Sequence, residues 1–101
     1  MDTKTLLAES KARFNHNAAK DYLAEKYQNK LVVAEQNGLW KADAETISLL
    51  NSLTKSKVVL IDTFSNPVKV DRKELLKTLR TVYNEVMEEW YEEWQELEGK
   101  R

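Results

Sequence analysis

The C-terminal part of the chain constrains the fold most, because its apolar residues recur at helical spacing over about seven turns. Positions seven residues apart carry Leu76, Tyr83, Trp90 and Leu97. Such a repeat is typical of a helix that buries one face. Asp71 precedes the run and Glu74 lies three residues after Asp71, which indicates a capping-box start. We therefore expect one long helix over residues 72–98 that ends near Gly99.

Two further helices are indicated upstream of this run. Apolar residues at helical spacing, together with several alanines, predict a helix over residues 3–29. Asp43 is a good N-cap, and Ile47 and Leu50 follow it at helical spacing. These features predict a short helix over residues 44–54.

Two β-hairpins are expected between the helices. Asn37-Gly38 separates two strand-like runs and predicts a hairpin over residues 31–42, because a type I′ turn needs positive φ at both central residues. Trp40 follows that turn and is expected in the core. Residues 57–62 form a continuous β-branched run, which is typical of a strand covered on both faces. This run and the return strand after Pro67 predict a second hairpin over residues 57–70.

The element order α-β-β-α-β-β-α predicts an α+β fold with two β-hairpins in one antiparallel sheet and a long C-terminal helix. With 101 residues, one Pro and two Gly, residues 1–101 are expected to form a single domain. The absence of cysteine excludes a disulfide framework, and a net charge of −1 excludes the strong field of a general nucleic-acid binder. Neither a membrane-spanning run nor a secretory signal is present, so we expect no membrane partner and a cytoplasmic location.

Charge along residues 72–98 runs against the helix dipole. Basic residues lie at the start of this segment, while its second half carries seven of its eight glutamates. Glutamates four residues apart, such as Glu85 and Glu89, also repel each other. An antiparallel copy would place each basic start beside an acidic end, so we expect a homodimer, or another protein docked there. The alternative is a helix that packs only within its own chain and whose acidic face aids solubility.

Aromatic residues near the end of the same helix are typical interface anchors. Trp90, Tyr91 and Trp94 lie within five residues, which is a large apolar load for the end of a small domain. The expected partner interface consists of Leu76, Leu79, Arg80, Tyr83, Met87, Trp90, Tyr91, Trp94 and Leu97.

No catalytic, cofactor-binding or metal-binding residues are expected, and the chain is interpreted as not being an enzyme. His16 is the only histidine, and no cysteine or Gly-x-Ser-x-Gly sequence accompanies it, so we expect a surface position. The glutamates of the last helix lack the Glu-x-x-His pattern of carboxylate-bridged metal helices. Asp62 and Asp71 flank the second hairpin and are interpreted as turn and N-cap residues rather than as an acid–base pair.

The first helix supports an alternative function as a weak nucleic-acid-binding accessory protein. Its basic and aromatic residues could clamp and stack single-stranded nucleic acid. They are Lys4, Lys11, Arg13, Phe14, Lys20, Tyr22, Lys26, Tyr27 and Lys30. Residues 1–42 nevertheless hold seven basic residues against five acidic ones, so nucleic acid is disfavoured as a partner.

Two stretches resemble small uncharacterised proteins of large contractile-tailed bacteriophages. The first runs from Asn37-Gly38-Leu39-Trp40-Lys41-Ala42 into residues 47–53. The second begins at Leu60-Ile61-Asp62, continues through residues 66–76 and includes Trp90-Tyr91. The resemblance covers most of the chain from about Ser10 and carries no assigned activity. It implies a phage accessory or virion-assembly protein, located in the host cytoplasm or in the virion. The expected function is that of a non-enzymatic interaction or structural protein.

Overall fold

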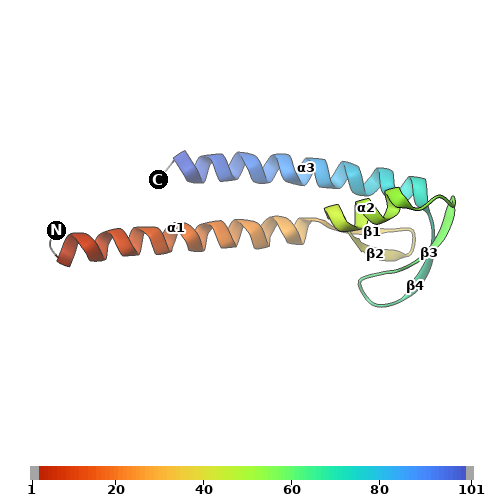
Figure 1. Ribbon diagram of the computed structural model, residues 1–101, viewed down its shortest axis with the longest axis horizontal. Coiled ribbons are helices and arrows are strands. Elements are labelled where there is room, and N and C mark those ends of the chain that lie inside the picture. The colour runs from red at the N-terminus through yellow and green to blue at the C-terminus, as the bar shows by residue number, and fades with distance from the viewer. Residues whose placement is uncertain (1–2, 100–101) are drawn as a thin grey trace.

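The computed structural model describes residues 3–99 and, from His16 onward, their side chains. Two long helices lie side by side, and a small head made of a short helix and two β-hairpins sits at one end (Figure 1). The molecule measures 65 × 25 × 20 Å and its radius of gyration is 19.3 Å. A compact chain of this length would have a radius of gyration of about 13 Å. The protein is therefore elongated.

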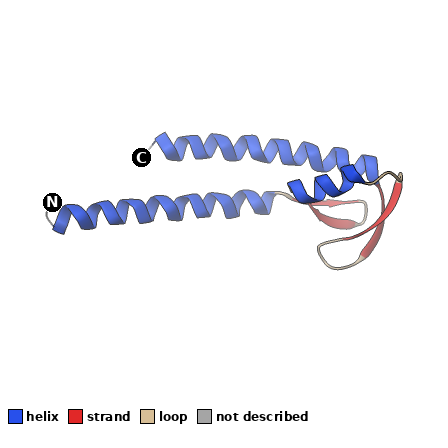
Figure 2. Cartoon of the chain, in the orientation of Figure 1, coloured by secondary structure: helices blue, strands red, loops and turns tan. Residues whose placement is uncertain are grey.

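The elements follow the predicted α+β order, and the long C-terminal helix is present (Figure 2). They are α1 (Thr3–Lys30), β1 (Val32–Glu35), β2 (Gly38–Lys41), α2 (Ala44–Ser52), β3 (Lys57–Ile61), β4 (Pro67–Asp71) and α3 (Arg72–Gly99). Each predicted helix ends within two residues of its observed boundary. The side chain of Asp43 accepts a hydrogen bond from the Thr46 amide at 2.8 Å, which confirms the N-cap of α2.

The hairpins form two separate two-stranded sheets, so the prediction of one antiparallel sheet is wrong. A single backbone hydrogen bond joins the sheets, from the Thr63 amide to the Leu39 carbonyl oxygen at 2.9 Å. The Leu39 amide donates instead to the Asp62 carboxylate at 3.2 Å. Because a side chain takes the place of the next backbone acceptor, the ladder between β2 and β3 does not continue.

The turn of the first hairpin lies one residue earlier than predicted. Positive φ occurs at Gln36 (47°) and Asn37 (64°), while Gly38 is the first residue of β2. Glycine is required at 38 for space, because a Cβ there would lie 2.5 Å from the ring of Trp40. That indole in turn donates from Nε1 to the Glu35 carbonyl oxygen at 2.7 Å. The Asn-Gly pair thus predicted the hairpin but not the position of its turn.

The core lies where the head meets the two long helices. Its buried apolar residues are Leu23, Tyr27, Leu31, Trp40, Ala42, Leu50, Val70, Leu75, Leu76, Leu79 and Val86. Trp40 is 3% exposed, which confirms its predicted core position. The prediction that β3 is covered on both faces is wrong, because Val59 and Ile61 are 61% and 64% exposed. Only the face of β3 that carries Val58 and Leu60 packs against the core.

Candidate functional site

Ion pairs along the two long helices define how they pack. The pairs are Lys30–Glu89 at 3.2 Å, Lys26–Glu93 at 2.7 Å, Lys20–Glu98 at 3.3 Å and His16–Glu98 at 3.2 Å. Residue numbers fall along α1 as they rise along α3, so the helices are antiparallel (Figure 1). The part of α1 before His16 extends past the end of α3 (Figure 1).

This packing gives the acidic end of α3 a basic neighbour within the same chain. Glu89, Glu93 and Glu98 each lie beside a lysine of α1. The sequence predicted that a second copy would supply the opposite charge, and the alternative was a helix packed only within its own chain with its acidic face in solvent. Three of the glutamates instead pair with α1 of their own chain, so charge order alone no longer argues for a partner.

A buried tyrosine forms the centre of the contact between α1 and α3. The ring of Tyr27 stacks on Trp90, with centroids 6.0 Å apart and an interplanar angle of 9°. Its hydroxyl donates to Glu93, which also accepts from Lys26. The Nζ atoms of Lys26 and Lys30 lie 5.1 Å and 4.9 Å from the centroid of the Tyr27 ring. Cations in such positions are attracted to the ring face.

The same hydrogen bonds shift three ionisation equilibria. The hydrogen bond from Lys26, and to a smaller extent that from Tyr27, lowers the pKa of Glu93. The hydrogen bond to Glu93 raises the pKa of Lys26, and likewise raises the pKa of Tyr27. The triad therefore favours one protonation state, in which Glu93 is ionised while Lys26 and Tyr27 keep their protons.

An aromatic patch, defined as Met87, Trp90, Tyr91 and Trp94, occupies the side of α3 next to this contact. Tyr91 and Trp94 are 54% and 40% exposed, and their rings stack with centroids 6.0 Å apart. The four residues line an open hollow of about 380 Å³. Trp90 belongs to both surfaces, because one side of its ring system packs on Tyr27. Exposed aromatic rings grouped in this way are typical of a binding surface.

The remaining residues of the predicted interface lie elsewhere. Leu76 and Leu79 are 7% and 0% exposed, so they belong to this chain's own core and offer nothing to a partner. Their inclusion was wrong because the seven-residue repeat continues without a break from the core-facing half of α3 into the patch. Arg80 donates to the Asn51 side chain at 3.0 Å, which ties it to α2. Tyr83 and Leu97 are partly buried against the core.

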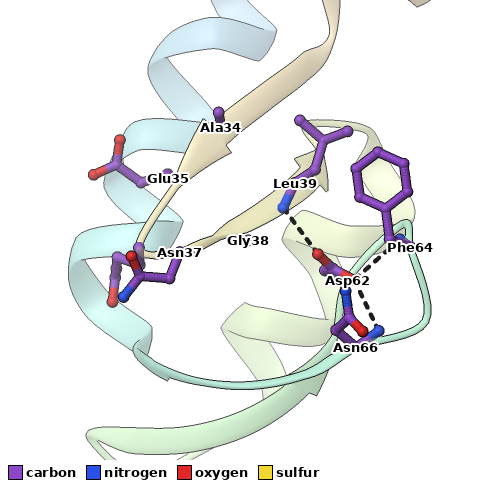
Figure 3. Close-up of a pocket in the computed structure, with 9 residues that line it drawn as sticks. Ala34, Glu35, Asn37, Gly38, Leu39, Asp62, Phe64 and Asn66 are labelled. Carbon is purple, nitrogen blue, oxygen red and sulfur yellow. Dashed lines mark hydrogen bonds between the residues drawn. The ribbon is translucent and has the colours of Figure 1, made fainter.

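Asp62 is the only buried charged or polar residue among those whose side chains are described, and it joins the two hairpins (Figure 3). Its carboxylate accepts hydrogen bonds from the amides of Leu39 at 3.2 Å, Phe64 at 3.0 Å and Asn66 at 2.9 Å. The bond from the Asn66 amide, with those from Leu39 and Phe64, lowers the pKa of Asp62. An open hollow of about 570 Å³ lies beside these residues. Because both carboxylate oxygens hold amides, Asp62 has a structural role, as predicted.

A glutamine side chain also joins the first hairpin to the rest of the head. Gln36 accepts from the Asp71 amide at 2.7 Å and donates to the Asp71 carbonyl oxygen at 3.1 Å. It therefore pairs with this peptide as a neighbouring strand would. Asp71 accepts from the Glu74 amide at 3.3 Å, which confirms half of the predicted capping box. The other half is wrong, because the Asp71 amide bonds to Gln36 and not to Glu74.

The residues considered for other chemistry lie apart from one another. His16 is paired with Glu98, its side chain is 12% exposed, and it is less accessible than expected. Within residues 16–99 no group of three or more potential metal ligands occurs, and none of the described helices could cross a membrane. The side chains of Lys4, Lys11, Arg13 and Phe14 lie outside the described residues. Comparisons with protein-family models, curated proteins and solved structures returned no match.

Proposed function

We propose that this chain is a non-enzymatic interaction protein that pairs with a second copy through the aromatic patch. The observation that carries the proposal is the exposed stack of Tyr91 on Trp94 beside a helix interface that is already complete. One apolar face of α3 is covered by α1 and the head, whereas Tyr91 and Trp94 of the patch stay exposed. Burying the exposed apolar surface of these rings against a partner would provide about 25 cal/mol per Å².

The sequence around the patch favours an antiparallel copy over a parallel one. At alternating spacings of four and three residues, one stripe of α3 carries Lys73, Lys77, Arg80, Asn84, Met87, Tyr91 and Trp94. In a parallel pair the three basic residues of both copies would face one another and repel. In an antiparallel pair centred between Met87 and Tyr91, these two residues face each other and Arg80 faces Glu98 of the other copy, so the basic residues of the two copies lie far apart.

The described residues do not favour the nucleic-acid alternative. Lys20, Lys26 and Lys30, which would contact phosphates, are paired with glutamates of α3. Tyr27, which would stack on a base, is 2% exposed. The resemblance to phage proteins supplies a setting for the proposal, in which the chain is an accessory or virion-assembly protein in the host cytoplasm or virion.

Sedimentation equilibrium of the full chain over a micromolar to millimolar range tests the proposed dimer. We expect a monomer–dimer equilibrium in the wild type and a monomer in the double variant Tyr91→Ala/Trp94→Ala. Both positions are well exposed, so thermal stability should change little. Since the contact is mainly apolar, added salt should weaken it only slightly.

Tyr22→Ala is the matched control, because Tyr22 is a 67% exposed aromatic residue on α1, away from the patch. It should leave the dimer intact. A wild-type chain that stays monomeric at the highest concentration contradicts the proposal. So does a dimer that survives the double variant. A dimer that dissociates on addition of salt would point instead to pairing driven by charge.

A further inference from the structure

The structure departs from the predicted sheet in two ways: β2 and β3 form no continuous ladder, and one face of β3 is exposed. Both departures occur at the outer edge of β3, the edge away from β4. The hydrogen bonds Asp62 N–H to Asn66 O and Arg72 N–H to Ser56 O set the pairing of β3 with β4. In an antiparallel ladder, hydrogen-bonded pairs alternate with non-bonded ones. The backbone groups of Val59 and Ile61 therefore point away from β4. Among residues 3–99 no other element satisfies them.

The opposite edge of the same sheet is protected, which makes the contrast informative. Pro67 sits at a non-bonded position of β4, where it presents no amide. The Gln36 side chain bonds to both outward backbone groups of Asp71. Lys69, which lies between Pro67 and Asp71 on this edge, is charged. Proline, lysine and side-chain covers are the usual means of blocking an edge strand. The edge of β3 carries none of these at Val59 and Ile61.

A groove opens along this unprotected edge. The strands β2 and β3 meet at the hydrogen bond between Thr63 and Leu39 and then separate, leaving a hollow of about 450 Å³. Its apolar walls include Leu49 of α2, which is 50% exposed, and the outward side chains of Val59 and Ile61. The site thus combines unpaired backbone groups with exposed apolar side chains on alternate residues.

We propose that the groove binds one extended segment of a partner protein, which pairs with the backbone of Val59 and Ile61 as a third strand. Strand addition to a free edge obtains affinity from main-chain hydrogen bonds and specificity from alternate side chains. The segment would place apolar side chains at every second position, against Val59, Ile61 and Leu49. This surface lies in the head and is independent of the aromatic patch on α3.

The shape and charge of the groove indicate which occupant fits. A second copy would have to bring its own β2 and α2 up to this groove along with its β3, whereas a single extended segment brings neither, so a lone segment is the occupant we propose. Lys41 lines the groove, whereas the one carboxylate there, Asp62, is held by three amides. Lys57, which begins the strand, is paired with the Asp71 carboxylate at 3.5 Å. The segment should therefore carry acidic residues beside its apolar ones.

Amide hydrogen exchange and chemical-shift mapping by NMR on the full chain test this proposal. The probe is a synthetic peptide, acetylated and amidated, of sequence Glu-Val-Thr-Val-Thr-Val-Glu. In the free protein the amides of Val59 and Ile61 should exchange faster than those of Val58 and Leu60, which point toward β4. Saturating peptide should slow exchange at Val59 and Ile61 and shift their resonances.

Val59→Pro and Lys69→Pro form a matched pair of variants, because these residues face each other across the sheet and both amides point outward. Neither change removes a bond between β3 and β4. Val59→Pro should weaken peptide binding by about tenfold or more, which corresponds to one main-chain hydrogen bond. Lys69→Pro should bind as the wild type does. If Val59→Pro fails to fold, Ile61→Glu serves, since it keeps the backbone and should repel the acidic peptide.

Three results would overturn the proposal. The first is the absence of any shift or protection at Val59 and Ile61 with millimolar peptide. The second is equal loss of binding in the two proline variants. The third is protection at these amides that rises with protein concentration when no peptide is present, because a second copy would then occupy the edge.

Discussion

The helical hairpin of α1 and α3 and the small head are held together in different ways. Between the long helices, side chains bond to side chains, as in the contacts of Lys26 and Tyr27 with Glu93. In the head, side chains bond to backbone, as Asp62 and Gln36 do. The first kind of contact depends on charge and tolerates adjustment of flexible side chains. The second kind of contact satisfies backbone groups that a neighbouring strand would otherwise bond. It therefore requires a particular side chain at a particular position.

This difference predicts how each region responds to substitution. Each ion pair of the helical hairpin is partly exposed, and pairs of that kind contribute little individually because water screens them. Loss of a side chain that satisfies buried amides leaves donors without acceptors. Single substitutions should therefore be severe in the head and mild along the helices.

Asp62→Ala should have the largest effect. It removes the acceptor of three backbone amides, those of Leu39, Phe64 and Asn66, and it separates the two hairpins. We expect the melting temperature to fall by more than about 10 °C, measured by circular dichroism.

Asp62→Asn distinguishes the turn from the junction. Its remaining carbonyl oxygen can still accept from Phe64 and Asn66, whereas its amide group cannot accept from Leu39. The loss should be intermediate, and exchange at the Leu39 amide should rise more than exchange at Asn66. Stability equal to that of wild type in both variants would show that Asp62 does not hold the head together.

Gln36→Ala should have a smaller effect, because it frees one donor and one acceptor of Asp71 at the start of α3. A loss of about 1–2 kcal/mol in the free energy of unfolding is expected from two such bonds, measured by urea denaturation. Gln36→Glu is the matched control: it can still accept from the Asp71 amide but cannot donate to the carbonyl oxygen. It should fall between Ala and wild type at neutral pH. Equal stability of all three proteins would contradict the pairing.

The two regions also differ in how far the sequence predicts them. Periodicity and caps predict the helices, because spacing and N-cap chemistry act locally, as Asp43 and Asp71 show. The pairing of α3 acids with α1 lysines had a visible signal, since Lys26 and Lys30, like Glu89 and Glu93, lie four residues apart in helices of opposite net charge. It was missed because a second copy satisfies the same charge rule as a neighbouring helix.

The head resists prediction for a different reason. Nothing local distinguishes a glutamine that caps a distant peptide from one that faces water, so the role of Gln36 follows only from the tertiary arrangement. The same holds for Asp62, whose turn function is local but whose bond to Leu39 is not. The aromatic patch lies between these cases. Tyr91 and Trp94 were predicted at an interface and are exposed, whereas the stack of Trp90 on Tyr27 could not be predicted.

Glu93→Gln and a pH titration should give the smallest effect and the sharpest view of the helical hairpin. Because the pKa of Glu93 is lowered, its contribution is present above its ordinary value of 4.5 and is lost as pH falls through the folded value. Because the pKa of Tyr27 is raised, its contribution is present below 10.0 and is lost as pH rises through the folded value. The raised pKa of Lys26 acts in the same alkaline direction.

We therefore expect Glu93→Gln to lower the melting temperature by only a few degrees at neutral pH and to flatten the alkaline loss. The acid loss should persist in part, because the pKa values of Asp62 and Asp71 are also lowered by hydrogen bonds from backbone amides. Ultraviolet difference spectroscopy of the wild type should show one tyrosine that ionises after the others. In Glu93→Gln, which no longer offers that tyrosine a carboxylate, this late step should move to lower pH. If this late ionisation does not move, the hydroxyl of Tyr27 is not bonded to Glu93 in solution. The contrast between the two regions would then rest on the head alone.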